Sequence, residues 1–211
     1  MTKVKRLAKV REIPIEDIDG FPDHPYKVRD DEEMAALVES IRDNGVMTPA
    51  VVRRKKDGRY ELLSGHRRKR ACELLWKETL RCEIVEIDDD AAIIFMCDSN
   101  LYRTKILPSE KAFAYKMRLD AMKRQGKRND LTCATLVHKL ERSRNLLAKE
   151  VGESHETIRR YIRLTELIPE ILKMVDEGQI ALRPAVEISY LPTDLQEELR
   201  VYGDGGMYTK S

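Results

Sequence analysis

The sequence predicts an α+β protein in which a small domain with a mixed sheet precedes an all-helical domain. Three observations predict this division. Strand-like and helix-like segments alternate up to about Ile87, the chain is wholly helical beyond Asp88, and residues 144–164 have the layout of a helix-turn-helix. We therefore expect a first domain over residues 1–104 and a second over residues 105–211.

The composition limits the class of protein. Charged residues make up 36% and hydrophobic residues 42% of the 211-residue chain, as in a globular protein. The 39 Lys and Arg residues nearly balance 37 Asp and Glu residues, so any case for nucleic-acid binding has to be local. Four scattered cysteines without a CxxC pair indicate reduced thiols in the cytoplasm. No apolar run approaches about 18 residues, so we expect neither secretion nor a membrane span.

The first predicted elements are a short strand, a loop and a helix. The strand covers Arg11–Ile18, and two prolines break regular structure at Phe21–Pro25. Apolar residues then recur three and four positions apart and predict one helical face: Met34, Leu37, Val38 and Ile41. Asp30 or Asp31 is the expected N-cap of this helix, and Gly45 its end.

A β-hairpin is predicted next. Its strands are Ala50–Arg53 and Tyr60–Ser64, separated by the turn Lys55–Gly58. The following helix carries one stripe formed by Arg67, Ala71, Leu74 and Leu75. Residues Arg81–Ile87 return to strand character and complete the first domain's sheet.

The second half of the chain is predicted to be helical. Helices are expected over Ala91–Leu101, from Pro108 to about Gln125, and in shorter segments to about Leu199. The stretch Lys123–Asp130 is rich in charge and predicts a loop.

The run Ser64–Ala71 is a candidate phosphate site, because it lies where a strand ends and a helix begins. Unpaired N–H groups at a helix N-terminus attract anions, and Gly65 would let an anion approach the backbone closely. Arg67 extends the apolar stripe, so we expect its guanidinium to point inward and to need an anionic partner. Arg68 and Arg70 could add bidentate phosphate contacts. The alternative is a solvated basic run on a surface helix.

A second candidate segment follows at residues 98–112. Asp98 and Asn100 offer oxygen ligands of the kind that Mg²⁺ accepts alongside phosphates, and Arg103 could reach the same phosphates. The alternative is a helix C-terminus capped by Asn100, with Pro108 starting the next helix.

The helix-turn-helix is predicted from small and apolar positions at the required spacing. Ala148 permits close helix crossing, Gly152 provides the turn, and Ile158 packs the second helix on the first. The residues expected to N-cap that helix or to reach DNA phosphates and base edges are Ser154, His155, Thr157, Arg159, Arg160 and Arg163. The alternative is an ordinary αα-hairpin with a charged exterior.

These runs, in this order, resemble the ParB family of partition proteins from about Ile13 to Leu199. Ser64–Ala71 is similar to the family's arginine-rich phosphate motif, Asn100–Ala112 to its next nucleotide motif, and Gly45–Arg53 to its first box.

The resemblance implies a CTP and Mg²⁺ site and a homodimer that closes as a clamp on a palindromic, centromere-like double-stranded DNA site. It also implies a ParA-type ATPase as partner and a nucleoid-associated place in the cytoplasm. Asp98 and Asn100 are the expected metal ligands. The expected nucleotide-binding residues are Thr48, Pro49, Gly65, His66, Arg67, Arg68, Arg70, Asn100 and Arg103.

Two positions depart from the family pattern. His66 and Ser99 stand where the family usually has glutamate, and loss of the second carboxylate predicts CTP binding with slow or absent hydrolysis. Sulfiredoxin, which has a related fold, uses a reactive cysteine beside a similar Gly-His-Arg turn. This chain has Ser64 before Gly65, and the nearest cysteine, Cys72, lies inside the following helix, so sulfiredoxin-type chemistry is not expected. Two alternative functions stay open: a transcriptional regulator without a nucleotide switch, and a metal-dependent nuclease.

Overall fold

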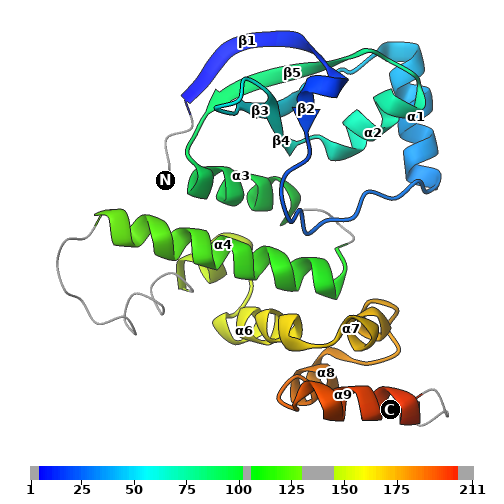
Figure 1. Cartoon of the computed structure of the whole chain (residues 1–211), viewed down its shortest axis with the longest axis vertical. Coiled ribbons are helices and arrows are strands. Elements are labelled where there is room, and N and C mark those ends of the chain that lie inside the picture. Colours follow the sequence, from blue (N-terminus) through cyan, green and yellow to red (C-terminus); the bar gives the residue numbers. More distant parts are fainter. Residues whose placement is uncertain (1–4, 102–105, 130–144, 204–211) are drawn as a thin grey trace. The chain divides into compact units, whose positions relative to one another are not determined.

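The computed structural model describes residues 5–101, 106–129 and 145–203 (Figure 1). The chain divides into two compact units, Met1–Asn100 and Leu101–Ser211. The first unit has a mixed sheet with helices, and the second is helical wherever it has regular structure within the described ranges. The predicted α+β class is thereby confirmed.

The sheet of the first unit has five strands in the order β1-β5-β3-β4-β2. Pairing is antiparallel for β1 with β5 and for β3 with β4, and parallel for β3 with β5 and for β2 with β4. The strands are β1 (Lys5–Pro14), β2 (Ile18–Asp19), β3 (Ala50–Arg54), β4 (Tyr60–Ser64) and β5 (Thr79–Glu86). The predicted hairpin is therefore present as β3 and β4.

The prediction of one strand over Arg11–Ile18 was wrong at both ends. β1 begins at Lys5 and ends at Pro14, and the 3-10 turn Ile15–Asp17 separates it from β2. Proline has no N–H to donate, so it ends the ladder there. β1 is an edge strand of this sheet.

Three helices accompany the sheet: α1 (Glu32–Asn44), α2 (His66–Leu74) and α3 (Asp89–Leu101). The α1 helix begins as expected, because the Asp31 carboxylate accepts a hydrogen bond from the Met34 N–H at 2.8 Å. It ends at Gly45, whose φ of +69° is favoured by glycine. Met34 and Ile41 are buried in a core that includes residues of the sheet, such as Val52, Leu62 and Leu80.

The inner face of α2 differs from the predicted stripe. Ala71 and Cys72 are fully buried, whereas Leu74 is 40% exposed at the end of the helix. Residues three and four positions apart lie on the same face of a helix. Arg68, before the buried pair, and Leu75, after it, both have this spacing and therefore extend the inner face. The arginine of this face is therefore Arg68 and not Arg67.

The second unit begins with α4 (Pro108–Asn129). Its length corrects the prediction of a loop at Lys123–Asp130, since residues up to Asn129 are helical. Lys, Arg and Gln are good helix formers, and one glycine at position 126 does not end a helix. Asp130 lies outside the described residues.

Within the described residues, α4 and the helices that follow it pack around two small cores. Residues 145–151 are helical, and the later elements are α6 (His155–Arg163), the 3-10 turn Leu164–Glu166, α7 (Pro169–Asp176), α8 (Leu182–Ile188) and α9 (Thr193–Gly203). Tyr115, Leu147 and Ile158 join α4 to the helix-turn-helix pair. A second core of residues such as Ile171 and Ala185 joins α7 to α8. Among the helices described, none is both long and apolar enough to cross a bilayer.

Candidate functional site

Gly65 makes the turn from β4 into α2, and only glycine suits this position. Its φ is +103°, and a Cβ atom there would lie 2.9 Å from the Ala50 Cβ and 3.3 Å from the Arg68 Cζ. The absence of a side chain therefore lets β3, the N-terminus of α2 and the Arg68 guanidinium come together. The sequence predicted that Gly65 lets an anion approach the backbone. The structure adds that the missing side chain also lets Ala50 of β3 approach it.

Arg68 is held by backbone carbonyls. Its Nη1 donates to the Thr48 carbonyl oxygen at 2.6 Å and to the Pro49 carbonyl oxygen at 2.5 Å. Burial of the guanidinium lowers the pKa of Arg68, and no carboxylate within the described ranges is paired with it. A desolvated cation with only neutral partners is a favourable place for an anion. Four of the expected nucleotide-binding residues thus meet: Thr48, Pro49, Gly65 and Arg68.

The other two arginines of this run are paired with carboxylates at the start of α1. Arg67 donates to Asp31 Oδ1 at 3.0 Å and to Glu33 Oε2 at 2.9 Å. Arg70 donates to the Asp30 carboxylate at 2.6 and 3.1 Å and thereby lowers the pKa of Asp30. We refer to Asp30, Asp31 and Glu33 as the acidic trio. The anionic partner that Arg67 was expected to need is thus supplied by the chain itself.

His66 is the first residue of α2, and its ring stacks on that of His24. The ring centroids are 3.7 Å apart, and His24 Nδ1 lies 2.7 Å from the Tyr26 carbonyl oxygen. The irregular segment 20–30 therefore reaches the start of α2. Sequence reasoning missed His24, since no spacing rule relates two residues so far apart on different elements.

Asn100 lies in the last turn of α3 and is only 4% exposed. Its Nδ2 donates to the Met96 carbonyl oxygen at 2.9 Å and to Ser99 Oγ at 3.1 Å. Within the described ranges, no group of three or more His, Cys, Asp or Glu side chains could hold a metal ion. Arg103 lies outside the described residues, and the metal role of Asp98 and Asn100 stays a prediction.

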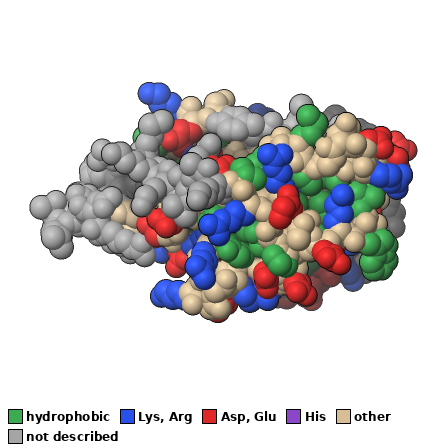
Figure 2. Space-filling model, turned by 90° about the horizontal axis from the view of Figure 1, so that it is seen from above, with side chains coloured by type: hydrophobic (Ala, Val, Ile, Leu, Met, Phe, Trp, Pro, Cys, Tyr) green, Lys and Arg blue, Asp and Glu red, His purple; other side chains and the backbone are tan. Residues whose placement is uncertain are grey.

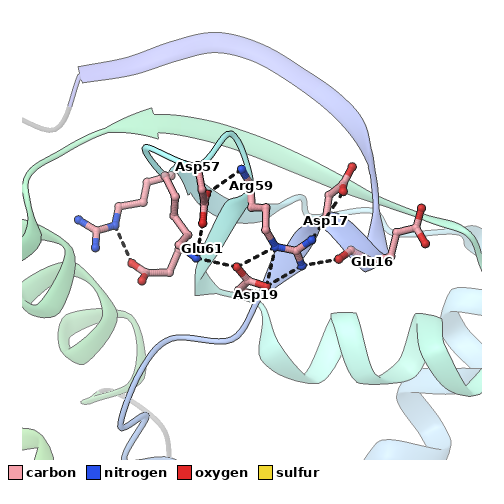
Figure 3. Close-up of polar contacts among 8 residues, drawn as sticks. Glu16, Asp17, Asp19, Asp57, Arg59 and Glu61 are labelled. Carbon is pink, nitrogen blue, oxygen red and sulfur yellow. Dashed lines mark hydrogen bonds and ion pairs between the residues drawn. The ribbon is translucent and has the colours of Figure 1, made fainter.

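A network of ion pairs joins β2 to the β3–β4 hairpin (Figure 3). Arg59 donates to Asp19 Oδ1 at 2.6 Å, and Lys55 donates to Asp19 Oδ2 at 2.8 Å. These bonds hold the pKa of Asp19 well below its usual range. The largely buried carboxylate of Glu61 pairs with Arg53 at 2.6 Å on the same hairpin.

This network secures the end of β4 that is remote from Gly65, because Arg59 precedes the strand and Gly65 follows it. Sequence reasoning missed it, since Asp19 and Arg59 are 40 positions apart. On the face shown in Figure 2, basic and acidic side chains are interspersed.

The helix-turn-helix has the expected construction. Gly152 has a φ of +69° between the two helices, and Ser154 caps α6 by accepting a hydrogen bond from the Thr157 N–H at 3.0 Å. Leu147 and Ile158 are fully buried between them. The second helix of the pair, α6, is therefore fixed by a turn, a cap and a core contact.

The predicted DNA-contacting residues differ in how free they are. The side chains of Arg159 and Arg160 are 60% and 39% exposed, and each lies more than 3.5 Å from the Glu156 carboxylate. His155 Nε2 is buried, and no hydrogen-bond partner occurs for it in the described part of the chain. The Thr157 hydroxyl lies 2.8 Å from Ser154 Oγ, so both belong to the cap.

Arg163 is half-buried and makes contacts within the second unit. Its Nε donates to Ser189 Oγ at 3.0 Å, its Nη2 donates to the Ser189 carbonyl oxygen at 2.6 Å, and its guanidinium lies 4.2 Å from the Tyr190 ring centroid. The guanidinium thus ties α6 to the end of α8, and its expected contact with DNA stays a prediction.

Comparison with known proteins gives two family matches. The model of the ParB N-terminal domain matches residues 1–101, and that of the ParB HTH domain matches residues 131–201. A probable chromosome-partitioning protein ParB of Pseudomonas putida is 29% identical over 190 residues, covering 90% of this chain and 59% of that protein. A nucleoid occlusion protein of Listeria monocytogenes is 31% identical over 193 residues, covering 90% and 61% respectively. The chain thus spans about three fifths of these relatives' length.

Among solved structures, the chain is similar to the C-terminally truncated chromosome-partitioning protein ParB of Caulobacter crescentus complexed to the centromeric parS site. The sequences are 25% identical, 92% of each chain is covered, and the TM-score is 0.52. The two family matches follow the order of the mixed-sheet unit and the helical unit. The chain belongs to the ParB family of partition proteins, with a ParB N-terminal domain followed by a ParB helix-turn-helix domain.

Proposed function

We propose that this chain is the nucleotide-gated, DNA-binding part of a partition protein. It binds CTP at the start of α2, reads a palindromic double-stranded DNA site through α6, and closes as a homodimeric clamp on that DNA. The main observation in favour of nucleotide binding is the Arg68 guanidinium, which is buried beside a helix N-terminus. Among the described residues, its hydrogen-bond partners are carbonyl oxygens and no carboxylate.

The residues around Arg68 suit a phosphate group. The N-terminus of α2 supplies unpaired backbone N–H groups, and Gly65 leaves no side chain in front of them. Arg68 supplies a positive charge whose position is fixed by Thr48 and Pro49. His66, Arg67 and Arg70 lie in the first two turns of the same helix and would contact the outer phosphates.

A metal ion would be held mainly by the nucleotide. Mg²⁺ commonly binds substrate phosphates together with one or two protein ligands, for which we propose Asp98 and Asn100. The Ser99 hydroxyl, which replaces the family's carboxylate, donates to the Met96 carbonyl oxygen at 2.9 Å. A hydroxyl engaged in its own helix is a poor substitute for a metal-binding carboxylate, so we expect hydrolysis of CTP to be slow or absent.

The DNA half is supported by the relative whose structure contains a parS site. We assign phosphate or base contacts to Arg159 and Arg160, whose side chains are 60% and 39% exposed, and to His155, the first residue of α6. Ser154 and Thr157 would act by fixing the start of that helix. A recognition helix of this kind enters the major groove, and a palindromic site would require two copies of the chain.

The proposal also covers the DNA on which the chain acts, its compartment and its protein partner. Relatives described as chromosome-partitioning and nucleoid occlusion proteins support action on chromosomal DNA, and we propose that the chain acts in the cytoplasm. A ParA-type ATPase is the proposed protein partner, as the family resemblance implies.

The proposed switch is tested by measuring DNA retention with and without nucleotide. A cognate duplex is first selected from a random pool, and protein on a closed circular copy is then challenged with salt. We expect CTP to increase the salt-resistant fraction several-fold on the circle and not on the linear form. Equal retention with and without CTP on both forms would leave a plain DNA-binding regulator.

A further inference from the structure

The acidic trio, Asp30, Asp31 and Glu33, occupies two of the arginines that the proposed nucleotide site needs. Arg67 donates to Asp31 at 3.0 Å and to Glu33 at 2.9 Å. Arg70 donates to both oxygens of Asp30. Carboxylates of α1 and of the two residues before it thus lie where phosphate oxygens would bind these two guanidinium groups.

These pairs are exchangeable, because they lie at the surface. The side chains of Asp30, Asp31 and Glu33 are 49%, 45% and 65% exposed. Exposed ion pairs stabilise a fold only weakly, since water and salt compete for both partners. A triphosphate carries several charges on one chain of linked phosphates, so it can replace single carboxylates on the same guanidinium groups.

Arg68 differs from Arg67 and Arg70 in its hydrogen-bond partners. Its guanidinium is turned onto the Thr48 and Pro49 carbonyls, and no trio carboxylate is bonded to it within the described residues. One part of the arginine run is therefore preformed for an anion, and the part at Arg67 and Arg70 is neutralised by the chain.

We propose that the acidic trio acts as an internal competitor of the nucleotide phosphates for Arg67 and Arg70. It thereby sets the nucleotide affinity below the value that the arginines alone would give. The proposal rests on the proposed nucleotide binding at α2. When the phosphates arrive, Arg67 and Arg70 leave the carboxylates, and the ionic link between α1 and α2 is broken.

The test compares CTP affinity, with Mg²⁺, of the full chain and of variants that remove charge but keep shape. Asp30→Asn and Glu33→Gln are each expected to tighten CTP binding about threefold to tenfold at moderate salt, because one competing charge is removed. Asp31→Asn is expected to act in the same direction, since asparagine still caps α1. Inorganic tripolyphosphate should show the same gain, and CMP little.

Two controls separate competition from a general change in charge. Glu39→Gln removes an exposed carboxylate of α1 whose partner is Arg42, so CTP affinity should not change. The gain from Asp30→Asn should disappear in an Arg70→Gln background, because Asp30 is proposed to act through Arg70. Thermal unfolding followed by circular dichroism verifies that each variant is folded.

The outcomes are distinct. If the unaltered chain binds CTP and the trio variants bind equally or more weakly, the competition is refuted while nucleotide binding stands. A gain that persists in the Arg70→Gln background also refutes it, because the effect would not pass through the ion pair. If neither the unaltered chain nor any variant binds CTP or tripolyphosphate, both proposals fall.

Discussion

Gly65 and Ala50 approach so closely that a Cβ atom at position 65 would lie 2.9 Å from the Ala50 Cβ. Real Cβ atoms do not come this near to another carbon, so the contact exists only because residue 65 is glycine. It sets the start of α2 directly against β3, where Thr48 and Pro49 lead into the strand. The position of the N–H groups at the start of α2, which we propose to bind phosphate, therefore depends on this contact.

Replacing Gly65 with alanine should destabilise the first unit. The left-handed φ of +103° and the contact with Ala50 together predict a loss of about 1–3 kcal/mol. Urea denaturation followed by circular dichroism measures the change. Gly20→Ala is the matched control, since nothing lies within 4 Å of its added Cβ. Equal stability of the two variants would show that the turn at Gly65 tolerates a side chain.

Removing the Asp19 charge should lower stability in a pH-dependent way. Hydrogen bonds from Arg59 and Lys55 lower the folded-state pKa of Asp19 below its ordinary 3.8. Its contribution is then fully present above the unfolded pKa and is lost as the pH falls through the folded pKa. Asp19→Asn should therefore lower the Tm at pH 7, and its difference from the unaltered chain should shrink below about pH 4. A difference independent of pH would contradict the role of the charge.

Removing the cap of the recognition helix should weaken the second unit. The Ser154 hydroxyl accepts a hydrogen bond from the Thr157 N–H, and loss of such a cap costs about 1 kcal/mol. Ser154→Ala should lower the free energy of unfolding by this amount, measured by urea denaturation. Ser154→Asp should restore it, because aspartate caps equally well. If the aspartate variant is no more stable than the alanine variant, the hydroxyl does not act as a cap.

Arg159 should contribute to DNA affinity through a phosphate or base contact. If the contact is to phosphate, Arg159→Gln should weaken binding to all duplexes alike and reduce the slope of log K against log salt by about one. Lys173→Gln is the control, because Lys173 is also a well-exposed cation of the second unit, on α7. Fluorescence anisotropy at several salt concentrations measures both. If Arg159→Gln has the same salt slope as Lys173→Gln and binds DNA as tightly as the unaltered chain, Arg159 does not contact DNA.

Local rules were sufficient for the elements that are specified by neighbouring residues. The cap at Asp31, the end of α1 at Gly45 and the turn at Gly152 each follow from one residue type at one backbone geometry. The hairpin of β3 and β4 follows in the same way from its turn. Such features depend on residues within a few positions of each other, so one sequence contains the signal.

The site required contacts that the sequence does not encode locally. The Arg70–Asp30 pair joins residues 40 positions apart, and the Arg163–Ser189 contact joins residues 26 apart. Which of Arg67 and Arg68 faces inward depends on how a nine-residue helix sits on the sheet. Hydrophobic periodicity could not decide this, since Leu74 lies at the end of the helix and escapes burial.

The most direct test of the central claim is a calorimetric titration of CTP, with Mg²⁺, into the chain and into Arg68→Gln. We predict a single binding event for the unaltered chain, with a dissociation constant in the micromolar range. This corresponds to a binding free energy on the order of −8 kcal/mol. Arg68→Gln should bind at least about tenfold more weakly, while circular dichroism shows that it is folded, because it loses a charge-assisted phosphate contact. Absence of CTP binding by the unaltered chain, or equal affinity in a folded Arg68→Gln variant, would contradict the account.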